Sequence, residues 1–352
     1  MSKFLIKKYD SLAPYTPGEQ PKERVYIKLN TNESPFPPSK KAVAAAAIEA
    51  ERLMLYSDPE CRDLVSKMAQ RFGVDSRSVI MTNGSDEVLN FAFMAYCDEK
   101  TPAVYADITY GFYKVFAAIN NLPSRVIPLR EDFSLNIDDY ISADGTVFIA
   151  NPNAPTGILL PLSEIERLLK SNPDRVVVID EAYIDFGGES AVALTKKYKN
   201  LLVTGTFSKS RSMAGARLGF GIARPEIIED LTRIRYSTNP YNVNRMTMAA
   251  GIGALTDDDY FTENCKKIIE NREWTEKELS SLGFTFTPSK ANFIFAKNDS
   301  IDGKALYLAL KEKGVLVRHF DAPRISDYNR ITIGNAEEMQ ILVDKIKEIL
   351  DK

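Results

Sequence analysis

Residues 204–220 read Thr-Gly-Thr-Phe-Ser-Lys-Ser-Arg-Ser-Met-Ala-Gly-Ala-Arg-Leu-Gly-Phe, with Lys209 just past a short apolar strand and Arg217 eight residues later. A lysine amine that is partly desolvated near other cations has a lowered pKa and can form a Schiff base with an aldehyde. The hydroxyls of Thr206 and Ser208 and the guanidinium of Arg217 suit a phosphate monoester. A Ser-Lys pair alone is typical of a polar surface loop, but the whole string favours a reactive lysine beside a phosphate site.

The strand before this segment is one of several short β-branched runs that alternate with helical segments between Val79 and about Ala223. These runs include Val79–Met81, Thr146–Ala150, Arg175–Ile179 and Leu201–Thr204. Strands that read as continuous apolar runs are buried on both faces, as in a mostly parallel sheet covered by helices. Ligands bind beyond the carboxyl ends of such strands. The pattern predicts an α/β fold with a large domain, over residues 39–240, whose polar clusters follow its strands.

Helix signals accompany these strands. Ser39 is expected to open an alanine-rich helix that runs to about residue 53. A second helix, over about residues 60–72, is expected to end at Gly73, the residue type that caps helices in the left-handed conformation. The capping box Ser163-Glu-Ile-Glu166 predicts the start of a further helix.

The two ends of the chain depart from this pattern. Residues 1–38 carry prolines at positions 14, 17, 21, 35, 37 and 38, and because proline blocks helix interiors they predict an irregular arm that packs with the small domain. After Tyr241, two long helices over about 243–255 and 260–281 lead to short strands. These strands are expected at 284–286, 292–296, 315–317 and 330–333. The pattern predicts a smaller α+β domain over residues 241–352.

A second polar motif, Val176-Val-Val-Ile-Asp180-Glu-Ala-Tyr183, follows a buried strand. Asp180 is placed to point into the ligand crevice, where a carboxylate can keep a pyridinium nitrogen protonated so that the ring acts as an electron sink. Tyr183 can donate to a phenolate oxygen. A strand followed by Asp-Glu also fits a metal-binding carboxylate, but the neighbourhood offers no histidine or further acidic partner, so the pyridinium reading is favoured.

Two further blocks follow strands. Thr82-Asn-Gly84-Ser85-Asp86-Glu87 precedes an apolar helix, and exposed amides at a helix N-terminus bind anions, with Gly84 allowing close backbone approach. The same residues would equally suit a simple Ser/Asp cap. Tyr110, in Ala106-Asp-Ile-Thr-Tyr-Gly-Phe, offers a ring that could stack on a flat cofactor, although a lone tyrosine is more often a core residue.

Composition excludes several classes of function. The 45 basic and 48 acidic residues leave a net charge of −3, so neither nucleic acid nor an anionic membrane is an expected partner. Cys61, Cys97 and Cys265 are few and widely spaced, which fits a reducing cytosol rather than a disulfide framework. His319 is the only histidine, so a histidine-rich zinc site is excluded and no metal is expected.

The chain carries no segment that indicates membrane insertion or secretion. Its longest apolar stretches fall far short of the roughly 20 residues that span a bilayer. Residues 1–8, Met-Ser-Lys-Phe-Leu-Ile-Lys-Lys, lack the extended apolar core of a secretory signal. We therefore expect a cytoplasmic protein.

In this order the blocks resemble the fold-type-I pyridoxal-phosphate (PLP) aminotransferases, and within them most of all the histidinol-phosphate aminotransferase family. The resemblance runs from Tyr15 through the C-terminal helix. It includes Lys28-Leu-Asn-Thr-Asn-Glu33, Tyr56-Ser-Asp-Pro, Asn151-Pro-Asn-Ala-Pro-Thr-Gly157, Asp180-Glu-Ala-Tyr183 and Arg330-Ile-Thr-Ile-Gly334. It implies the fold-type-I architecture and pyridoxal 5'-phosphate as cofactor.

The resemblance also implies roles for individual residues around the cofactor. Lys209 would be the Schiff-base lysine, Asp180 the partner of the pyridine nitrogen, Tyr183 a contact of the ring hydroxyl, and Tyr110 the ring that stacks on the cofactor. The residues that would surround the phosphate are Gly84, Ser85, Asp86, Thr206, Ser208 and Arg217.

Other implied roles concern the neighbouring subunit and the substrate. Tyr56 resembles the tyrosine that reaches the phosphate from the neighbouring subunit, which implies a homodimer with shared sites. Arg330 resembles the arginine that grips the substrate carboxylate, a bidentate task suited to guanidinium. Arg318, Tyr15 and Asn32 match positions that line the substrate pocket, and His319 is expected at its rim beside Arg318.

One position departs from the family pattern. The family usually has asparagine directly before Pro-Thr-Gly, where it hydrogen-bonds the ring hydroxyl, and this chain has Ala154. Either Asn153 replaces this asparagine, or Tyr183 alone hydrogen-bonds the ring hydroxyl. One lost neutral hydrogen bond costs about 1 kcal/mol, which would tune the cofactor rather than abolish its chemistry.

The reaction that the resemblance implies transfers an amino group between L-histidinol phosphate and 2-oxoglutarate, in histidine biosynthesis. Three alternatives share most of these blocks. An aromatic amino-acid aminotransferase would differ in pocket residues, and a threonine-phosphate decarboxylase would break a different bond at Cα. A non-catalytic PLP-binding protein is disfavoured by the joint presence of Lys209, Asp180 and Arg330.

Overall fold

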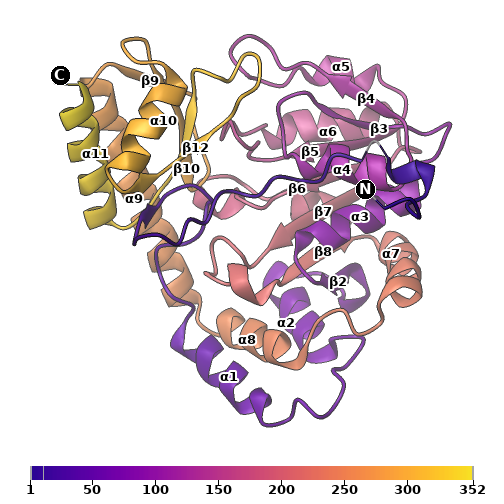
Figure 1. The fold of residues 1–352 in the computed structure, drawn as a ribbon. Helices are drawn as coiled ribbons and strands as arrows, with labels where there is room; N and C mark the ends of the chain where they lie inside the picture. The colour runs from indigo at the N-terminus through magenta and orange to yellow at the C-terminus, as the bar shows by residue number, and fades with distance from the viewer. Residues whose placement is uncertain (1, 11, 351–352) are drawn as a thin grey trace.

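A seven-stranded sheet forms the centre of the larger domain in the computed structural model, which describes residues 2–10 and 12–350 (Figure 1). Across the sheet the strands are β2 (Val79–Thr82), β8 (Gly219–Ala223), β7 (Leu201–Thr206), β6 (Val177–Asp180), β5 (Thr146–Ala150), β3 (Ala103–Ala106) and β4 (Ser124–Ile127). β8 pairs antiparallel with both of its neighbours, and the other pairs are parallel. The predicted mostly parallel α/β sheet is therefore confirmed.

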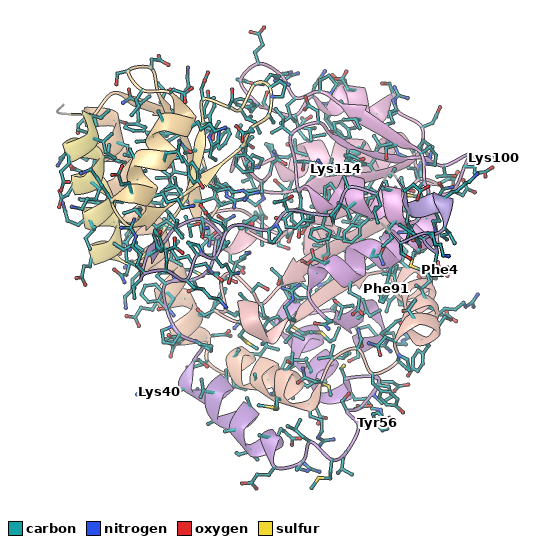
Figure 2. The ribbon with its side chains drawn as sticks, in the orientation of Figure 1. Phe4, Lys40, Tyr56, Phe91, Lys100 and Lys114 are labelled. Carbon is teal, nitrogen blue, oxygen red and sulfur yellow. The ribbon has the colours of Figure 1, made fainter. Side chains whose placement is uncertain are left out.

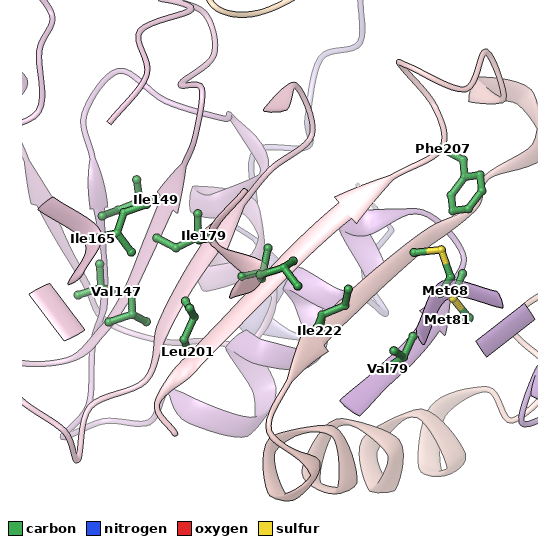
Figure 3. Packing of buried hydrophobic residues seen from close by; sticks show 14 of the residues in the cluster. Met68, Val79, Met81, Val147, Ile149, Ile165, Ile179, Leu201, Phe207 and Ile222 are labelled. Carbon is green, nitrogen blue, oxygen red and sulfur yellow. The ribbon is translucent and has the colours of Figure 1, made fainter. Parts of the chain in front are cut away.

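Helices cover both faces of this sheet because successive strand residues point to opposite sides. In β6, Val177 and Ile179 belong to one buried cluster, shown in part in Figure 3, and Val178 belongs to the other. The cluster of Val178 includes side chains of α3 (Ser85–Tyr96), α4 (Phe112–Ile119) and α7 (Pro225–Thr238). The opposite cluster includes side chains of α1 (Lys40–Ala50), α2 (Arg62–Phe72), α5 (Ile137–Ile141), α6 (Leu162–Ser171) and α8 (Arg245–Leu255).

The smaller domain is built on an antiparallel sheet with helices packed against it (Figure 1). Its strands, in order, are β12 (Arg318–His319), β13 (Asn329–Thr332), β10 (Phe293–Asn298) and β9 (Phe284–Phe286). Its helices are α9 (Asp258–Ser281), α10 (Gly303–Glu312) and α11 (Ala336–Leu350). Outside this smaller domain, the described chain also contains short 3-10 helices: η1 (Lys7–Tyr9), η2 (Ser76–Ser78), η3 (Ile184–Phe186), η4 (Ala191–Lys196) and η5 (Ala214–Ala216).

The N-terminal arm contacts both domains. Tyr15 stacks on Phe112 of α4, with ring centroids 4.3 Å apart. Farther along, the carboxylate of Glu19 accepts hydrogen bonds from α10 side chains. β1 (Ile27–Lys28) then pairs in parallel with β11 (Val315–Leu316) of the small domain. The arm thus crosses from one domain to the other, as the indigo segment of Figure 1 shows.

Two of the predicted helix signals are confirmed and one is wrong. The Ser39 side chain accepts a hydrogen bond from the amide of Ala42 at the start of α1, and Gly73 ends α2 with φ of 61°. Ser163 does not cap α6, because that helix already begins at Leu162. Pro161 is its N-cap, with φ of −62° and an extended ψ, so the chain enters the helix earlier than the capping box predicted.

Helix α8 packs with the large domain, although the sequence pattern assigned it to the small one. It lies against α1, and Ala250 and Ala254 belong to the same buried cluster as the sheet. A β-carbon at Gly253 would stand 2.5 Å from the carbonyl oxygen of Lys41, so glycine is what permits this close approach. We therefore propose that the small domain begins at α9 rather than at residue 241.

The 24-residue helix α9 joins the two domains. Near its start, the ring of Phe261 lies 4.2 Å from the guanidinium of Arg211 in the large domain. Farther along, Ile268 and Leu279 enter the buried cluster of the small domain. Within the described part of the chain, no helix combines the length and the apolar character needed to cross a membrane.

The replacement Gly253→Ala tests the packing of α8 on α1. Alanine is a better helix former than glycine by about 1 kcal/mol, so without the contact the replacement would stabilise the protein. The clash with the backbone of α1 reverses that sign, and we expect a net loss of about 1–3 kcal/mol in the free energy of unfolding, measured with urea. Gly215→Ala is the control, because a β-carbon there meets nothing within 4 Å. Unchanged or increased stability of Gly253→Ala would contradict this packing.

Candidate active site

A cavity of about 330 Å³ lies where the strands β5, β6 and β7 end, and it brings most of the predicted cofactor residues together. Its polar lining comprises Thr31, Glu33, Ser85, Asp86, Tyr110, Asp180, Tyr183, Thr206, Ser208, Lys209 and Arg217. Its remaining lining comprises Ala150, Pro152, Ala154, Ala182, Ala214 and Gly215. These residues come from the arm, from the start of α3 and from the loops after four strands, so the cavity exists only in the folded chain.

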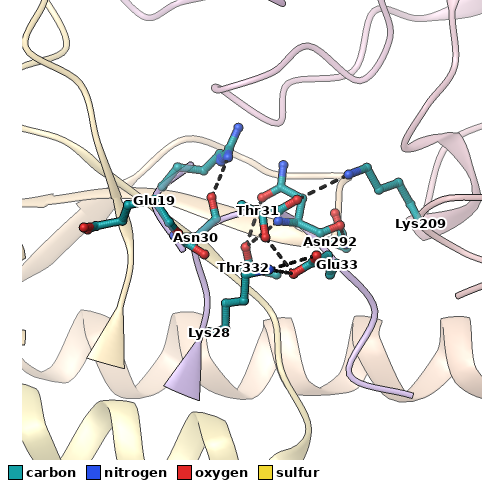
Figure 4. Close-up of polar contacts among 10 residues, drawn as sticks. Glu19, Lys28, Asn30, Thr31, Glu33, Lys209, Asn292 and Thr332 are labelled. Atoms are coloured by element: carbon teal, nitrogen blue, oxygen red, sulfur yellow. Dashed lines mark hydrogen bonds and ion pairs between the residues drawn. The ribbon is translucent and has the colours of Figure 1, made fainter. Parts of the chain in front are cut away.

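Lys209 reaches into this cavity from the loop after β7. Its Nζ donates to the carbonyl oxygen of Thr31 at 3.3 Å, beside the ion pair of Lys28 and Glu33 (Figure 4). Burial, together with the charge of Arg330, lowers the pKa of Lys209 to about 8, although Glu33 acts in the opposite direction. About a tenth of this amine is therefore unprotonated at pH 7, far more than for an ordinary lysine with a pKa of about 10.4, and the unprotonated form is the nucleophile.

Asp180 ends β6 with its side chain on the α3 and α4 side of the sheet. Its Oδ2 accepts a hydrogen bond from the hydroxyl of Tyr113 at 3.1 Å, and its Oδ1 has no hydrogen-bond partner among the described residues. Burial raises the pKa of Asp180 to about 7, against the lowering effect of the Tyr113 hydrogen bond. A buried carboxylate oxygen without a partner is costly. A protonated ring nitrogen, such as the cofactor implied by the resemblance carries, would satisfy Oδ1.

The start of α3 and the loop before β8 form an anion cradle. Arg217 Nη2 lies 3.0 Å from Asp86 Oδ2, and the hydroxyl of Tyr110 donates to Asp86 Oδ1 at 2.7 Å. A β-carbon at Gly84 would stand 2.5 Å from Arg217 Nη2, so only glycine lets the guanidinium lie against the helix start. Amides at a helix N-terminus and a guanidinium together bind phosphate, and the Asp86 carboxylate orients the guanidinium.

The predicted substrate residues lie beside this cavity, at the junction of the arm and the small domain. Arg330 is half-buried, its Nη2 donates to the carbonyl oxygen of Asn30 at 3.0 Å, and its buried Nε has no partner within the described structure. Burial lowers the pKa of Arg330, and an anion would relieve this cost. Asn32 Nδ2 donates to the Tyr183 hydroxyl at 2.9 Å. Burial raises the pKa of Tyr15, whereas the charges of Arg330 and, less strongly, Arg318 lower it.

Asn153, one of the two predicted replacements for the missing asparagine, has other hydrogen-bond partners in this structure. Its Nδ2 donates to the Ile108 carbonyl and to Thr156 Oγ1, each at 3.0 Å, and its Oδ1 accepts from Thr109 Oγ1 at 2.7 Å. It lines a separate cavity of about 240 Å³. The cofactor cavity instead meets the methyl group of Ala154, which leaves Tyr183 as the predicted partner of a ring hydroxyl.

Two other residues singled out from the sequence lie away from the cavity of their own chain. The side chain of Tyr56 is 81% exposed and stacks on Tyr241, with ring centroids 4.6 Å apart. His319, expected at the rim of the substrate pocket, stacks on Tyr307 of α10, with ring centroids 5.9 Å apart. Arg318, its neighbour in β12, donates to carbonyl oxygens of the arm at 3.2 and 3.3 Å.

The alternative of a metal site on Asp180 and its neighbour Glu181 does not fit the geometry. The two carboxylates line different cavities. Glu181 accepts hydrogen bonds from Ser190 Oγ and from the amide of Ala191, each at 2.6 Å. Throughout residues 2–10 and 12–350, no three side chains of the types that bind metals gather into a site.

Three residues of the site were missed from the sequence. Thr31 and Glu33 stand in a block that was recognised, but their contact with Lys209 depends on where the arm lies. Tyr113 follows Tyr110 by three residues, near the start of α4. Because Tyr110 lies before the first residue of that helix, helical spacing offered no signal for Tyr113.

Comparison with known proteins supports the same chemistry. The model of the aminotransferase class I and II family matches residues 24–346. A histidinol-phosphate aminotransferase of Brachyspira hyodysenteriae is 50% identical over 99% of both chains. One of Clostridium acetobutylicum is 47% identical over 99% of this chain and 100% of its own.

Among solved structures, the histidinol-phosphate aminotransferase of Sinorhizobium meliloti in complex with pyridoxal-5'-phosphate has a similar fold. The TM-score is 0.86, with 24% sequence identity over 93% of this chain and 92% of the other. At this identity the likeness concerns the fold, and it agrees with the fold-type-I architecture expected from the sequence.

The depressed pKa predicts that Lys209 reacts at lower pH than an ordinary lysine. We expect acylation of Lys209 in the cofactor-free protein to rise with an inflection near pH 8, whereas a free lysine titrates at about 10.4. Pulse labelling at several pH values, followed by peptide mass spectrometry, measures this. The exposed Lys40 and Lys100 (Figure 2) serve as internal standards. Labelling of Lys209 that rises only in step with these standards would contradict the lowered pKa.

Proposed function

The chain belongs to the class I and II aminotransferase family, and from that premise we propose that it transfers an amino group between L-histidinol phosphate and 2-oxoglutarate. Histidine biosynthesis is the setting of this reaction, and pyridoxal 5'-phosphate is the cofactor. The observation that carries the proposal is the meeting of Lys209, Asp180 and Arg217 in one cavity. Full-length identities of 46–50% to histidinol-phosphate aminotransferases support the choice of donor.

The residues of the cavity fit the cofactor group by group. Lys209 would hold it covalently, and the unpartnered Oδ1 of Asp180 would bind its ring nitrogen. Its phosphate would lie at the start of α3 with Arg217 and the hydroxyls of Thr206 and Ser208, which are 2.9 Å apart. When bound, pyridoxal phosphate supplies an electron sink for the charge left when a bond at the substrate Cα breaks.

Lys209 has the position and the pKa of a general base. Its amine, with a pKa of about 8, can take a proton at Nζ and return it, because both protonation states are accessible near neutral pH. The carbonyl oxygen of Thr31 accepts a hydrogen bond from Nζ and so gives the amine a defined resting position.

Arg330 is the residue best suited to the anionic end of both substrates. Histidinol phosphate carries a phosphate where 2-oxoglutarate carries a carboxylate, so the site has to accept two kinds of anion. The guanidinium presents a planar fork of donors that suits either. Its buried Nε lacks a partner in the described structure, and Arg318 adds a second positive charge nearby.

The proposed functional unit is a homodimer in which Tyr56 serves the neighbouring site. The segment that ends at Tyr56 exposes three consecutive apolar side chains, Leu53, Met54 and Leu55, each more than half accessible. It lies between α1 and α2, at the edge of the molecule (Figure 2). Exposed apolar surface of this kind is typical of a protein interface. The stacking of Tyr56 on Tyr241 would orient it toward a second subunit.

Donor selectivity tests the proposed reaction. Titration of the holo-protein with L-histidinol phosphate or L-glutamate should produce the visible absorbance change that accompanies amino transfer, and L-phenylalanine should produce little. A preference for phenylalanine would favour an aromatic aminotransferase, and release of carbon dioxide from threonine phosphate would favour the decarboxylase. Lys209→Ala is the control and should lose the absorbance of the lysine-bound cofactor.

Mixing two inactive variants tests the role of Tyr56. Lys209→Ala removes the base from its own subunit, and Tyr56→Ala removes the proposed contact from its neighbour's site. In a hybrid dimer one site would carry both changes and the other neither, so refolding the two variants together should restore up to about half the activity per hybrid dimer. The two variants refolded separately are the controls. Absence of recovery, with hybrid dimers verified by mass spectrometry, would contradict a shared site.

A further inference from the structure

The Asp180 carboxylate is held by a tyrosine that no sequence block identified. The hydroxyl of Tyr113 donates to Asp180 Oδ2 at 3.1 Å, and both side chains are buried. The other oxygen, Oδ1, lacks a partner in the described part of the chain, and Asp180 lines the cofactor cavity. The two oxygens therefore differ: the fold occupies one and leaves the other for a ligand.

Packing holds the ring of Tyr113 in place. Its centroid lies 5.9 Å from that of Tyr105 and 6.0 Å from that of Phe148, and the ring of Tyr110 meets it edge-on at 5.8 Å. A fully buried tyrosine needs a partner for its hydroxyl, and Asp180 is that partner. Because the neighbouring rings hold the phenol of Tyr113 in place, its hydrogen bond sets the orientation of the Asp180 carboxylate.

We propose that Tyr113 is a positioning residue for the cofactor, whose hydroxyl turns Asp180 Oδ1 toward the ring nitrogen and keeps the carboxylate ionised. This inference rests on the proposed cofactor and adds a residue that acts through Asp180 without touching substrate. Without the hydroxyl, Oδ2 would lose its donor and the carboxylate would be free to rotate or to take up a proton. The ring nitrogen would then face a neutral or misdirected group.

The charges around Asp180 explain why this one hydroxyl matters. Burial raises the pKa of Asp180 to about 7, and the charge of Asp86 on α3 raises it further. Asp180 in turn raises the pKa values of Tyr110, Tyr183 and Glu181, which also lie around it. The Tyr113 hydroxyl lowers the pKa of Asp180, and the backbone amide of Ala182 lowers it less. Removal of the Tyr113 hydroxyl should therefore move the ionisation of Asp180 to higher pH.

The test compares Tyr113→Phe with Tyr105→Phe. Tyr105 belongs to the same aromatic cluster, and its hydroxyl donates to Ser124 Oγ at 3.0 Å instead of to Asp180. Each cofactor-free protein is titrated, from about pH 6 to pH 9, with pyridoxal phosphate and with an analogue that carries a C–H group in place of the ring nitrogen. Binding is followed by equilibrium dialysis, and thermal unfolding verifies that each variant folds.

We expect Tyr113→Phe to weaken binding of pyridoxal phosphate roughly tenfold to a hundredfold, because hydrogen bonds to charged groups are strong. The loss should be largest at the acid end of the pH range, and binding of the analogue should change little. Tyr105→Phe should resemble the wild type with both compounds. Equal weakening for both compounds would indicate a merely structural role, and unchanged binding would also overturn the inference. Failure of the wild type to bind pyridoxal phosphate would instead overturn the proposed function.

Discussion

The parallel register of β5, β6 and β7 is the constraint on which the site depends. It places Ala150, Asp180 and Thr204 at one level across the sheet. Because the three strands run in the same direction, the loops that follow them leave the sheet at the same edge. Lys209 is carried on the loop after β7 and Tyr183 on the loop after β6, so residues far apart in sequence face one cavity.

Burial acts on the acid and the base of this cavity in opposite ways. It raises the pKa of Asp180 to about 7 and lowers that of Lys209 to about 8, so each group moves toward its neutral form. A ligand with a cationic ring nitrogen, a reactive carbonyl and a phosphate would relieve the cost on both groups and would also bind Arg217. Burial of Asp180 and Lys209 thus costs free energy in the cofactor-free protein, and a bound cofactor of this kind would offset that cost.

The substrate side of the site belongs to the junction between the domains. The loop after β5 docks on the small domain, where Gly157 packs so closely on Ser289 that a β-carbon would stand 2.4 Å from its Oγ. Arg272 of α9 donates to the carbonyl oxygens of Phe186 and Ala291, at 2.9 and 2.8 Å. These two hydrogen bonds link the segment after β6 to the small domain. The small domain therefore carries Arg330, whereas the large domain carries most of the cofactor site. The N-terminal arm runs along the boundary between the two domains.

The sequence by itself determined the class of fold and the cofactor chemistry, because both are written in short local patterns. Apolar runs predicted the buried strands, and residue types that follow those strands predicted Lys209 and Asp180. Tertiary structure alone decided that Tyr113 holds Asp180, that Asn153 turns away from the cofactor cavity, and that α8 packs with the large domain. These outcomes depend on which surfaces meet after the chain folds. Local sequence indicates which secondary structure a residue favours. The hydrogen-bond partner of a buried polar group instead depends on segments that are distant in sequence and packed together in the fold.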